Sequence, residues 1–313
     1  KENTVISSGV TSISGRPHAE FNSLNKIKNT NGSNLYTSLE PCVHHGLTPP
    51  CINIIIKKKI KNVYYGCEDP DLRTYKKAKN ILNKKGIHAK LIKSKNYKKF
   101  YRSYLFNHKF KIPFISAKIA ISNDFYTINK KKKWITNKFS RKINHLFRSQ
   151  NDAIISTSKS INNDNSLLNC RIKGLNNYKP DLFILDLNLK LKKSLNLNMI
   201  LRKRKTYIIT YSSNSKKAQN FREKGYKIIL VDTLDRRDDF ILLFKKLYQI
   251  GYSRILIEAG LTFINTLIKN KLINDLYIFQ SNDNIKKNGK NNDTSKYIKN
   301  ILFNTKPIIL NNE

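Results

Sequence analysis

Apolar positions in the first third of the chain fall into short runs typical of strands, separated by stretches with helical spacing. The runs predict strands at residues 4–11, 34–39, 62–67 and 88–92. The stretches between them predict helices at residues 17–27, 50–58 and 76–85, with Pro17 at the first helical position and Gly86 as a C-terminal stop. This alternation predicts a layered α/β domain with a largely parallel sheet.

A charged, aromatic-containing connector at residues 93–111 precedes a second alternating region. Strands are expected at residues 114–121, 153–156, 182–185, 207–210, 227–231 and 254–258. The clearest helical stretches are residues 140–149, 240–250 and 261–269. We therefore expect a second, mostly parallel α/β domain, with residues 282–295 forming a solvated loop or a disordered segment.

The length of 313 residues favours two domains, which we place at residues 1–111 and 112–313. No apolar run approaches the ~20 residues of a membrane helix, and the first residues lack a signal-peptide pattern. A cytoplasmic protein without a membrane partner is expected. Because the chain begins with Lys1 and its one methionine is Met199, we expect it to be trimmed or preceded by further sequence, so that its first domain is N-terminally incomplete.

The formal net charge of +39 by itself suggests a nucleic-acid partner. Lys, Asn and Ile are all over-used, however, and AT-rich codons explain that bias without a selected phosphate-binding surface. The lysines are scattered and are not interleaved with aromatic residues in a stacking pattern. We therefore do not expect nucleic acid as a partner and expect an attraction to small phosphorylated molecules.

Two of the four cysteines belong to a spacing that indicates a catalytic metal. His18 is followed by Glu20, then by Cys42 and Cys51. One histidine and two cysteines supply three ligands to a tetrahedral zinc and leave one position open for water. Glu20 is not needed as a ligand and can move protons. Cys67 and Cys170 are expected to be buried small residues.

The combination of His-x-Glu with Pro-Cys-x-x-Cys is typical of nucleobase deaminases. In this chain the two cysteines, Cys42 and Cys51, stand nine positions apart instead of three. Zinc lowers the pKa of its water towards neutrality, and Glu20 would pass the proton to the leaving ammonia. The alternative interpretation is a structural zinc site that His44 or His45 completes.

The motifs of the first domain resemble the bifunctional deaminase/reductase family of riboflavin biosynthesis. They read Arg16-Pro17-His18-Ala19-Glu20 and then Leu39-Glu40-Pro41-Cys42-x-His44-His45-Gly46-x-Thr48-Pro49-Pro50-Cys51. The resemblance continues in the second domain through Lys118-Ile119-Ala120, Trp134-Ile135-Thr136, the segment from Arg148 to Arg171, and Glu258-Ala259-Gly260-x-Thr262.

This resemblance implies a cytidine-deaminase-like three-layer α/β domain followed by a dihydrofolate-reductase-like α/β domain. It implies deamination of a pyrimidine bearing a phosphoribosylamino arm, followed by reduction of the ribosyl chain with NADPH. By analogy, zinc binds His18, Cys42 and Cys51, with Glu20 as the proton shuttle. NADPH would contact Ala120, Trp134, Ser160, Asp164, Leu187, Gly260, Leu261, Thr262, Phe263, Ile264, Asn265 and Thr266. The substrate would contact Lys132, Arg148, Leu168, Arg171 and Glu258.

Several positions depart from the family pattern. Leu47 stands where the family usually has Arg or Lys, and Lys132 stands where it often has Ser. These departures keep two alternatives open: a deaminase with a degenerate second domain, and a basic RNA-binding or RNA-editing zinc deaminase. A homo-oligomer is expected.

Overall fold

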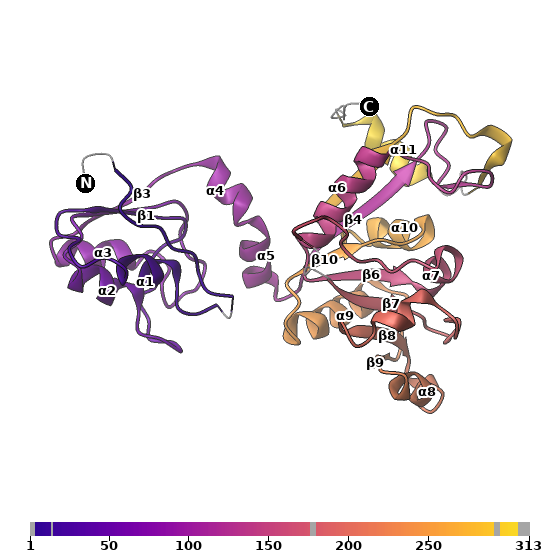
Figure 1. The fold of residues 1–313 in the computed structure, drawn as a ribbon, viewed down its shortest axis with the longest axis horizontal. Helices are drawn as coiled ribbons and strands as arrows, with labels where there is room; N and C mark the ends of the chain where they lie inside the picture. Colours follow the sequence, from indigo (N-terminus) through magenta and orange to yellow (C-terminus); the bar gives the residue numbers. More distant parts are fainter. Residues whose placement is uncertain (1–3, 14, 176–179, 291–294, 306–313) are drawn as a thin grey trace. The chain divides into compact units, whose positions relative to one another are not determined.

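The computed structural model describes residues 4–13, 15–175, 180–290 and 295–305. The chain divides into two compact units, Lys1–Phe110 and Lys111–Glu313 (Figure 1).

The first unit is built on a three-stranded parallel sheet in the order β1-β2-β3. The strands are β1 (Asn34–Thr37), β2 (Asn62–Tyr65) and β3 (His88–Leu91). The helices that pack beside them are α1 (Ala19–Leu24), α2 (Cys51–Lys57) and α3 (Ala78–Lys84). Leu35, Val63 and Ala89 are paired in register and belong to one buried cluster with side chains of all three helices. The predicted parallel α/β sheet is confirmed.

Two further helices, α4 (Lys95–Phe100) and α5 (Arg102–Phe110), form most of the predicted connector. The ring of Tyr97 in α4 packs so closely on Gly66, just beyond β2, that a Cβ at Gly66 would lie 2.5 Å from it. The Tyr101 hydroxyl lies 2.6 Å from that of Ser38, just beyond β1. Ser38 and Gly66 continue the face of the sheet opposite to Leu35 and Val63, so helices flank both faces in the expected three layers.

The prediction of a strand at residues 4–11 is wrong. A strand needs a ladder partner, and the described residues of this segment instead run along α1. Asn22 donates its side-chain amide to the carbonyl of Val10 at 2.8 Å, and the Ser7 hydroxyl donates to the carbonyl of Ser23 at 3.0 Å. Gly9 lies so close to α1 that a Cβ there would be 2.4 Å from the carbonyl oxygen of Ala19.

The second unit contains a seven-stranded sheet in the order β11-β4-β10-β6-β7-β8-β9, and every neighbouring pair is parallel. In chain order the strands are β4 (Phe114–Ile121), β6 (Ala153–Thr157), β7 (Asp181–Leu185), β8 (Thr206–Tyr211), β9 (Lys227–Val231), β10 (Arg254–Ile257) and β11 (Asp275–Gln280). The predicted parallel arrangement is confirmed for this unit also.

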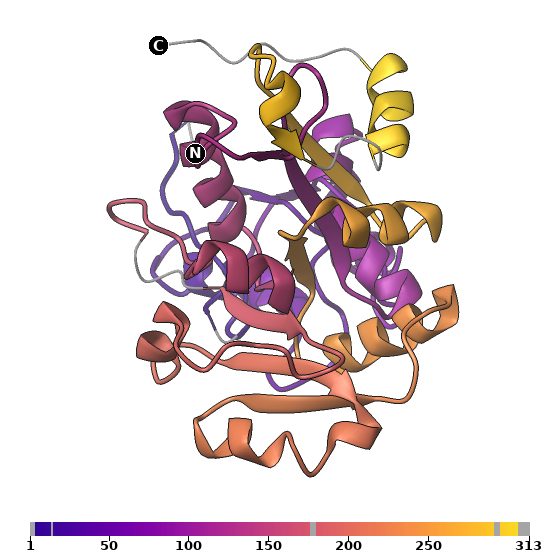
Figure 2. The same cartoon turned by 90° about the vertical axis from the view of Figure 1, so that its right-hand side faces the viewer.

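Helices cover both faces of this sheet (Figure 2). They are α6 (Lys138–Ser149), α7 (Ser158–Asp164), α8 (Gln219–Glu223), α9 (Arg237–Gln249), α10 (Leu261–Lys269) and α11 (Lys296–Phe303). Alternate strand residues enter two separate cores: Ile155 and Phe183 pack with α9 and α10, whereas Ile154 and Leu182 pack with Ile161 of α7. Burial on both faces explains the continuous apolar runs of these strands.

Short elements complete the second unit. They are the antiparallel pair β5 (Ile128–Asn129) and β12 (Gly289–Lys290) and the 3-10 helices η1 (Asn196–Ile200), η2 (Ser212–Asn214) and η3 (Lys286–Asn288). Residues 282–295, expected as a loop or disorder, thus include η3 and β12, while positions 291–294 lie outside the described residues. In the described part of the chain, no helix is long and apolar enough to span a membrane.

Candidate active sites

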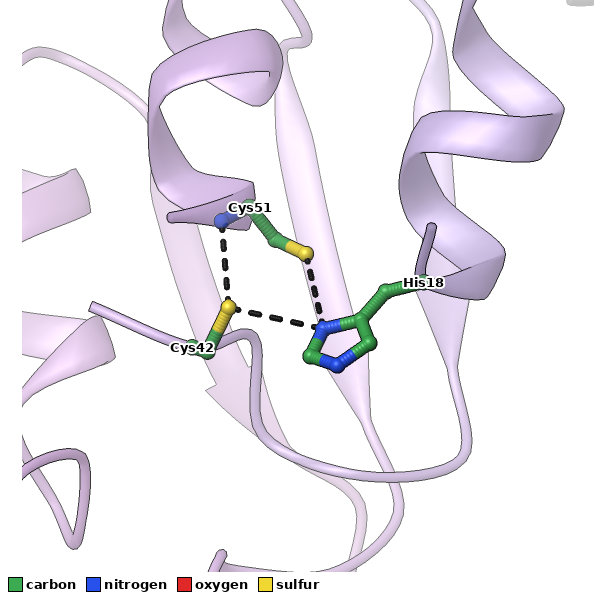
Figure 3. A group of neighbouring side chains, drawn as sticks. All are labelled: His18, Cys42 and Cys51. Atoms are coloured by element: carbon green, nitrogen blue, oxygen red, sulfur yellow. Dashed lines mark hydrogen bonds between the residues drawn. The ribbon is translucent and has the colours of Figure 1, made fainter. Parts of the chain in front are cut away.

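Three side chains converge in the first unit from three separate segments (Figure 3). His18 is the N-cap of α1, Cys42 lies in the loop that follows β1, and Cys51 is the first residue of α2. The Nδ1 atom of His18 lies 3.5 Å from Sγ of Cys42 and 3.3 Å from Sγ of Cys51. All three ligand atoms lie within 4.8 Å of one another.

These separations fit a tetrahedral zinc. Bond lengths of about 2.0 Å to nitrogen and about 2.3 Å to sulfur place the nitrogen and sulfur ligands roughly 3.5 Å apart. The predicted cluster therefore forms, although Pro17 precedes the N-cap rather than occupying the first helical position, and α1 ends at Leu24. The C-cap residue Asn25 still donates its N–H to the Phe21 carbonyl, so the helix is shorter than the predicted 17–27.

The two thiols share their protons unequally. The Cys51 thiol and the Cys51 backbone N–H, the latter at 3.2 Å, both donate to Sγ of Cys42, and with the nearby His18 they lower the pKa of Cys42 to about 5 despite its burial. The pKa of Cys51 is raised, because its proton is held by Cys42 and because it is buried. One thiolate is thus available before a metal binds, and a metal would replace the proton that the pair shares.

Glu20 lies in the first turn of α1, two residues beyond His18. Burial raises the pKa of its carboxyl group above the ordinary value, partly offset by a hydrogen bond from its own backbone N–H and by the nearby His18. The carboxyl group therefore lies beside the metal-binding cluster in an environment that favours its holding a proton.

Glu40 is a site residue that the sequence analysis quoted only as part of a motif. Its side chain is buried, and its carboxylate accepts three backbone N–H groups: from Asp69 at 3.2 Å, Lys76 at 3.1 Å and Ala78 at 3.0 Å. Two residues further on, the chain reaches Cys42. Through these hydrogen bonds, Glu40 connects the loop after β1, which carries Cys42, to the segment between β2 and α3. The signal for this role was a lone acidic residue between apolar Leu39 and Pro41.

In the second unit, the predicted substrate residues Arg148 and Glu258 form a buried ion pair. Arg148 Nε donates to Oε1 of Glu258 at 2.6 Å and Nη2 donates to Oε2 at 2.8 Å. Nη1 of Arg148 donates to the carbonyl of Asn169 at 2.9 Å. Burial raises the pKa of Glu258, but the charge and hydrogen bonds of Arg148 outweigh it and hold that pKa at about 2.

Asn169 links this pair to Arg171 and follows Leu168, two of the other predicted substrate residues. Nη1 of Arg171 donates to the side-chain oxygen of Asn169 at 2.9 Å, and the Arg171 N–H donates to Nδ1 of His145 at 3.3 Å. Burial, then the charges of Arg148 and Arg171, lower the pKa of His145 to about 4, which keeps that ring neutral and able to accept. Leu168 precedes Asn169 with a φ of 49°, so the loop takes a left-handed turn here.

Two polar groups near Glu258 had no role predicted from the sequence: Asn144, and Lys118, which was quoted only as part of a motif. The Asn144 side-chain amide donates to Oε2 of Glu258 at 3.0 Å. Lys118 lies in β4, and burial lowers the pKa of its amine while the nearby Glu258 raises it. A lysine within the apolar run of β4 was the sequence signal for this position.

Some of the predicted cofactor residues meet at the start of α10. Gly260 is the N-cap of this helix, and its N–H donates to the hydroxyl of Ser160 at 3.2 Å. Thr157, the N-cap of α7, donates its hydroxyl to Ser160 at 3.0 Å. A helix start capped by glycine exposes backbone N–H groups without a side chain in front of them, which suits a dinucleotide phosphate. Residues Leu261 to Thr266 form the first two turns of α10.

The remaining predicted cofactor and substrate positions lie on other elements of the second unit. Ala120 is in β4, and Asp164 ends α7, where burial raises its pKa and Lys133 lowers it. The Leu187 carbonyl accepts from the side chains of Thr210 at 3.0 Å and Asn214 at 2.7 Å. Trp134 is 54% exposed with the Arg141 guanidinium 4.8 Å from its ring centre, and Lys132 is exposed. Within the described residues, no hydrogen bond or ring contact joins Trp134 or Lys132 to Ser160 and Gly260.

Comparison with known proteins decides the family. The RibD C-terminal domain profile matches residues 113–281, more than half of the chain, and the profile of the zinc-binding region of cytidine and deoxycytidylate deaminases matches residues 1–67. The chain belongs to the RibD family. The riboflavin biosynthesis protein RibD of Aquifex aeolicus is 27% identical over 286 residues, covering 89% of this chain and 78% of the relative. RibD of Buchnera aphidicola is 30% identical over 293 residues, covering 88% and 77%.

Solved RibD structures share the fold. RibD of Acinetobacter baumannii superposes with a TM-score of 0.79 at 23% identity, covering 93% of this chain and 80% of that one. The deaminase/reductase of Thermotoga maritima gives a TM-score of 0.73 at 24% identity, covering 87% and 75%.

The predicted family, fold class and enzyme class are therefore confirmed. As a RibD family member, the chain is an enzyme of riboflavin biosynthesis with a zinc-dependent deaminase domain and an NADPH-dependent reductase domain. The family match includes the reductase domain. It therefore favours neither the alternative of a degenerate second domain nor that of an RNA-directed deaminase.

Proposed function

We propose that residues 1–111 deaminate a pyrimidine that bears a phosphoribosylamino arm, and that residues 112–313 then reduce the ribosyl chain of the product. The convergence of His18, Cys42 and Cys51 beside Glu20 carries the first half of this proposal. Water is consumed and ammonia released in the first reaction; NADPH supplies the two electrons of the second.

In the deaminase domain, His18, Cys42 and Cys51 would hold zinc, which when bound acidifies a water molecule. Glu20 takes a proton from the attacking water at its carboxylate and delivers that proton to the departing amino group. The enclosed position of Glu20 suits the first step, because a carboxylate with a raised pKa is a better proton acceptor.

In the reductase domain, the cofactor would be held by Ala120, Trp134, Ser160, Asp164, Leu187 and the α10 residues Gly260, Leu261, Thr262, Phe263, Ile264, Asn265 and Thr266. When bound, NADPH supplies a hydride to the opened ribosyl carbon. Its pyrophosphate would lie at the start of α10, where backbone N–H groups and the helix dipole favour an anion.

The reductase substrate would be held by Lys132, Arg148, Leu168, Arg171 and Glu258. Arg148 acts through its neighbours, since its three guanidinium nitrogens already donate to Glu258 and Asn169. Its positive charge keeps the Glu258 carboxylate ionised, and its two hydrogen bonds to that carboxylate hold the side chain in one orientation. Arg171 is then the guanidinium better placed to meet the substrate phosphate.

The deciding experiment is mass spectrometry of the phosphoribosylaminopyrimidine incubated with zinc-loaded protein, with and without NADPH. We expect deamination in both samples and reduction of the deaminated product only with NADPH. Deamination without reduction would contradict the reductase assignment, and an unchanged substrate would contradict both assignments.

The expectations about the cellular setting remain proposals. Four free cysteines, Cys42, Cys51, Cys67 and Cys170, suit a reducing compartment such as the cytoplasm. We propose a homo-oligomer that does not bind nucleic acid. Light scattering of the purified protein tests the first, and an RNA titration at several salt concentrations tests the second, because phosphate contacts give a steep salt dependence.

A further inference from the structure

Arg204 lies in the segment before β8 and holds the loop that follows α7. Its side chain is buried, with 6% of the residue exposed. Nη1 donates to the carbonyls of Leu168 at 3.0 Å and Pro180 at 3.2 Å, and Nη2 donates to the carbonyl of Leu167. One guanidinium thus joins three segments: the loop after α7, the residue before β7 and the approach to β8.

The acceptors of this buried cation are backbone carbonyls rather than a carboxylate. Within the described ranges, no acidic side chain forms an ion pair with Arg204, and its Nε has no hydrogen-bond partner. Burial, then the charge of Arg148, lower the pKa of Arg204 to about 10, so the guanidinium stays charged at neutral pH. Burying a charge without a counter-charge is costly, and an apolar side chain would fill this place at a lower cost. What the guanidinium adds is a directional hold on the loop carbonyls.

The held carbonyls lie directly before Arg171. The carbonyls of three consecutive residues, 167–169, each accept a hydrogen bond from a buried guanidinium: the first two from Arg204, and the third from Arg148 at 2.9 Å. The side-chain oxygen of Asn169 accepts from Nη1 of the exposed Arg171, also at 2.9 Å. The position from which Arg171 reaches outward is therefore set by the carbonyls before it.

We propose that Arg204 is a positioning residue of the reductase domain, which fixes residues 167–169 so that Arg171 can meet the substrate phosphate. This inference rests on the proposed function and adds a residue that acts through Arg171. Leu168 has a φ of 49°, a backbone conformation that a leucine adopts only when its surroundings impose it. The hydrogen bond from Arg204 to the Leu168 carbonyl is one of those constraints. Without it, the loop would relax and Arg171 would lose its fixed starting point.

The test measures reduction of the pre-deaminated, phosphorylated substrate by wild type and Arg204→Met, followed as NADPH consumed. We expect the KM for this substrate to rise by about tenfold, the order expected when a hydrogen bond to a charged group is lost. The KM for NADPH and the rate of deamination should stay unchanged. Arg202→Met removes an exposed arginine from the same segment and should behave as wild type.

A double-mutant cycle shows whether Arg204 acts through Arg171. Arg171→Met should by itself raise the KM for the phosphorylated substrate. If Arg204 only positions Arg171, adding Arg204→Met to that variant should raise KM no further, because coupled residues are not additive. A purely structural role for Arg204 would give the full rise in both backgrounds.

Arg204→Lys guards against a methionine variant that does not fold. An ammonium group keeps the charge but lacks the planar fork that reaches several carbonyls at once. We expect a folded protein in which the KM for the substrate rises by less than in Arg204→Met. The same cycle with Arg171→Met can be run on this variant.

The outcomes separate the inference from the function on which it rests. If Arg171→Met raises the KM for the substrate but the folded Arg204 variants do not, the role of Arg204 is overturned. Additive effects in the cycle, or an equal rise in the KM for NADPH, also overturn it and point to a structural role. Absence of reduction by the wild type, or an unchanged KM in Arg171→Met, would instead overturn the proposed function or the part that it gives to Arg171.

Discussion

Arg148 and Glu258 stand 110 positions apart in the sequence and meet through two hydrogen bonds of 2.6 and 2.8 Å. Arg148 comes from α6, and Glu258 follows β10, a central strand of the sheet. Both side chains are almost fully withdrawn from solvent, with 9% exposure each. A buried charge without its partner is costly, so each residue depends on the other.

Replacing Arg148 with Met should destabilise the second unit by roughly 3–5 kcal/mol at pH 7, because Glu258 would stay buried without its counter-charge. Urea unfolding followed by the fluorescence of Trp134 measures this, since the single tryptophan lies in this unit. Arg222→Met in the exposed turn of α8 serves as the control and should change stability by less than about 0.5 kcal/mol.

The same pair predicts an acid dependence. The folded-state pKa of Glu258 is about 2, below its ordinary value of 4.5, so its contribution to stability is present above pH 4.5 and is lost as pH falls towards 2. In Arg148→Met the carboxyl group would protonate readily, so this loss disappears. The difference in unfolding free energy between wild type and variant should therefore shrink from pH 5 to pH 3, and a constant difference would contradict the pairing energetics.

Glu20→Gln should abolish deamination while zinc stays bound. The amide cannot accept the proton of the attacking water, so we expect kcat to fall by about 10²–10⁴-fold. Reduction of a pre-deaminated substrate with NADPH should proceed at the wild-type rate. Glu223→Gln, in the exposed α8, is the matched control. Normal deamination by Glu20→Gln would show that another group carries the proton.

Gly260→Ala should weaken NADPH binding without disturbing the fold. The φ of Gly260 is −66°, and a Cβ there would meet its nearest neighbour, the Ser160 hydroxyl, at an ordinary 3.7 Å. The free protein therefore has room for the methyl group, but a phosphate approaching the N-terminus of α10 would meet it. We expect an unchanged melting temperature, a higher KM for NADPH and unchanged deamination; an unchanged KM would place the phosphate elsewhere.

Glu40→Gln should loosen the loop between β2 and α3. Glutamine has one acceptor oxygen, so its NH₂ group would face at least one of the three backbone N–H donors now bound by the carboxylate. Leaving a buried donor unpaired costs about 1–3 kcal/mol. Hydrogen exchange at the Ala78 amide should accelerate, while amides of the second unit keep their protection. Equal protection of Ala78 in both proteins would show that the carboxylate is not needed there.

The local pattern of residues determined much of this protein. The apolar run over Phe114–Ile121 predicted β4 with its observed bounds, because a strand buried on both faces must be apolar along its whole length. The spacing of His18, Cys42 and Cys51 predicted their convergence, since helix starts and strand ends bring such positions to one edge of a parallel sheet. The roles of the reductase residues came from the family resemblance and stay predictions.

Only the tertiary structure decided the rest. The apolar residues at 4–11 have the composition of a strand, but a strand forms only where another strand offers its backbone, and here the segment bonds to α1 instead. Likewise, the sequence shows that Arg148 and Glu258 are charged but not that they neutralise each other in a buried pair. Pairing across 110 residues depends on which elements pack together, and that is a property of the folded chain rather than of any local pattern.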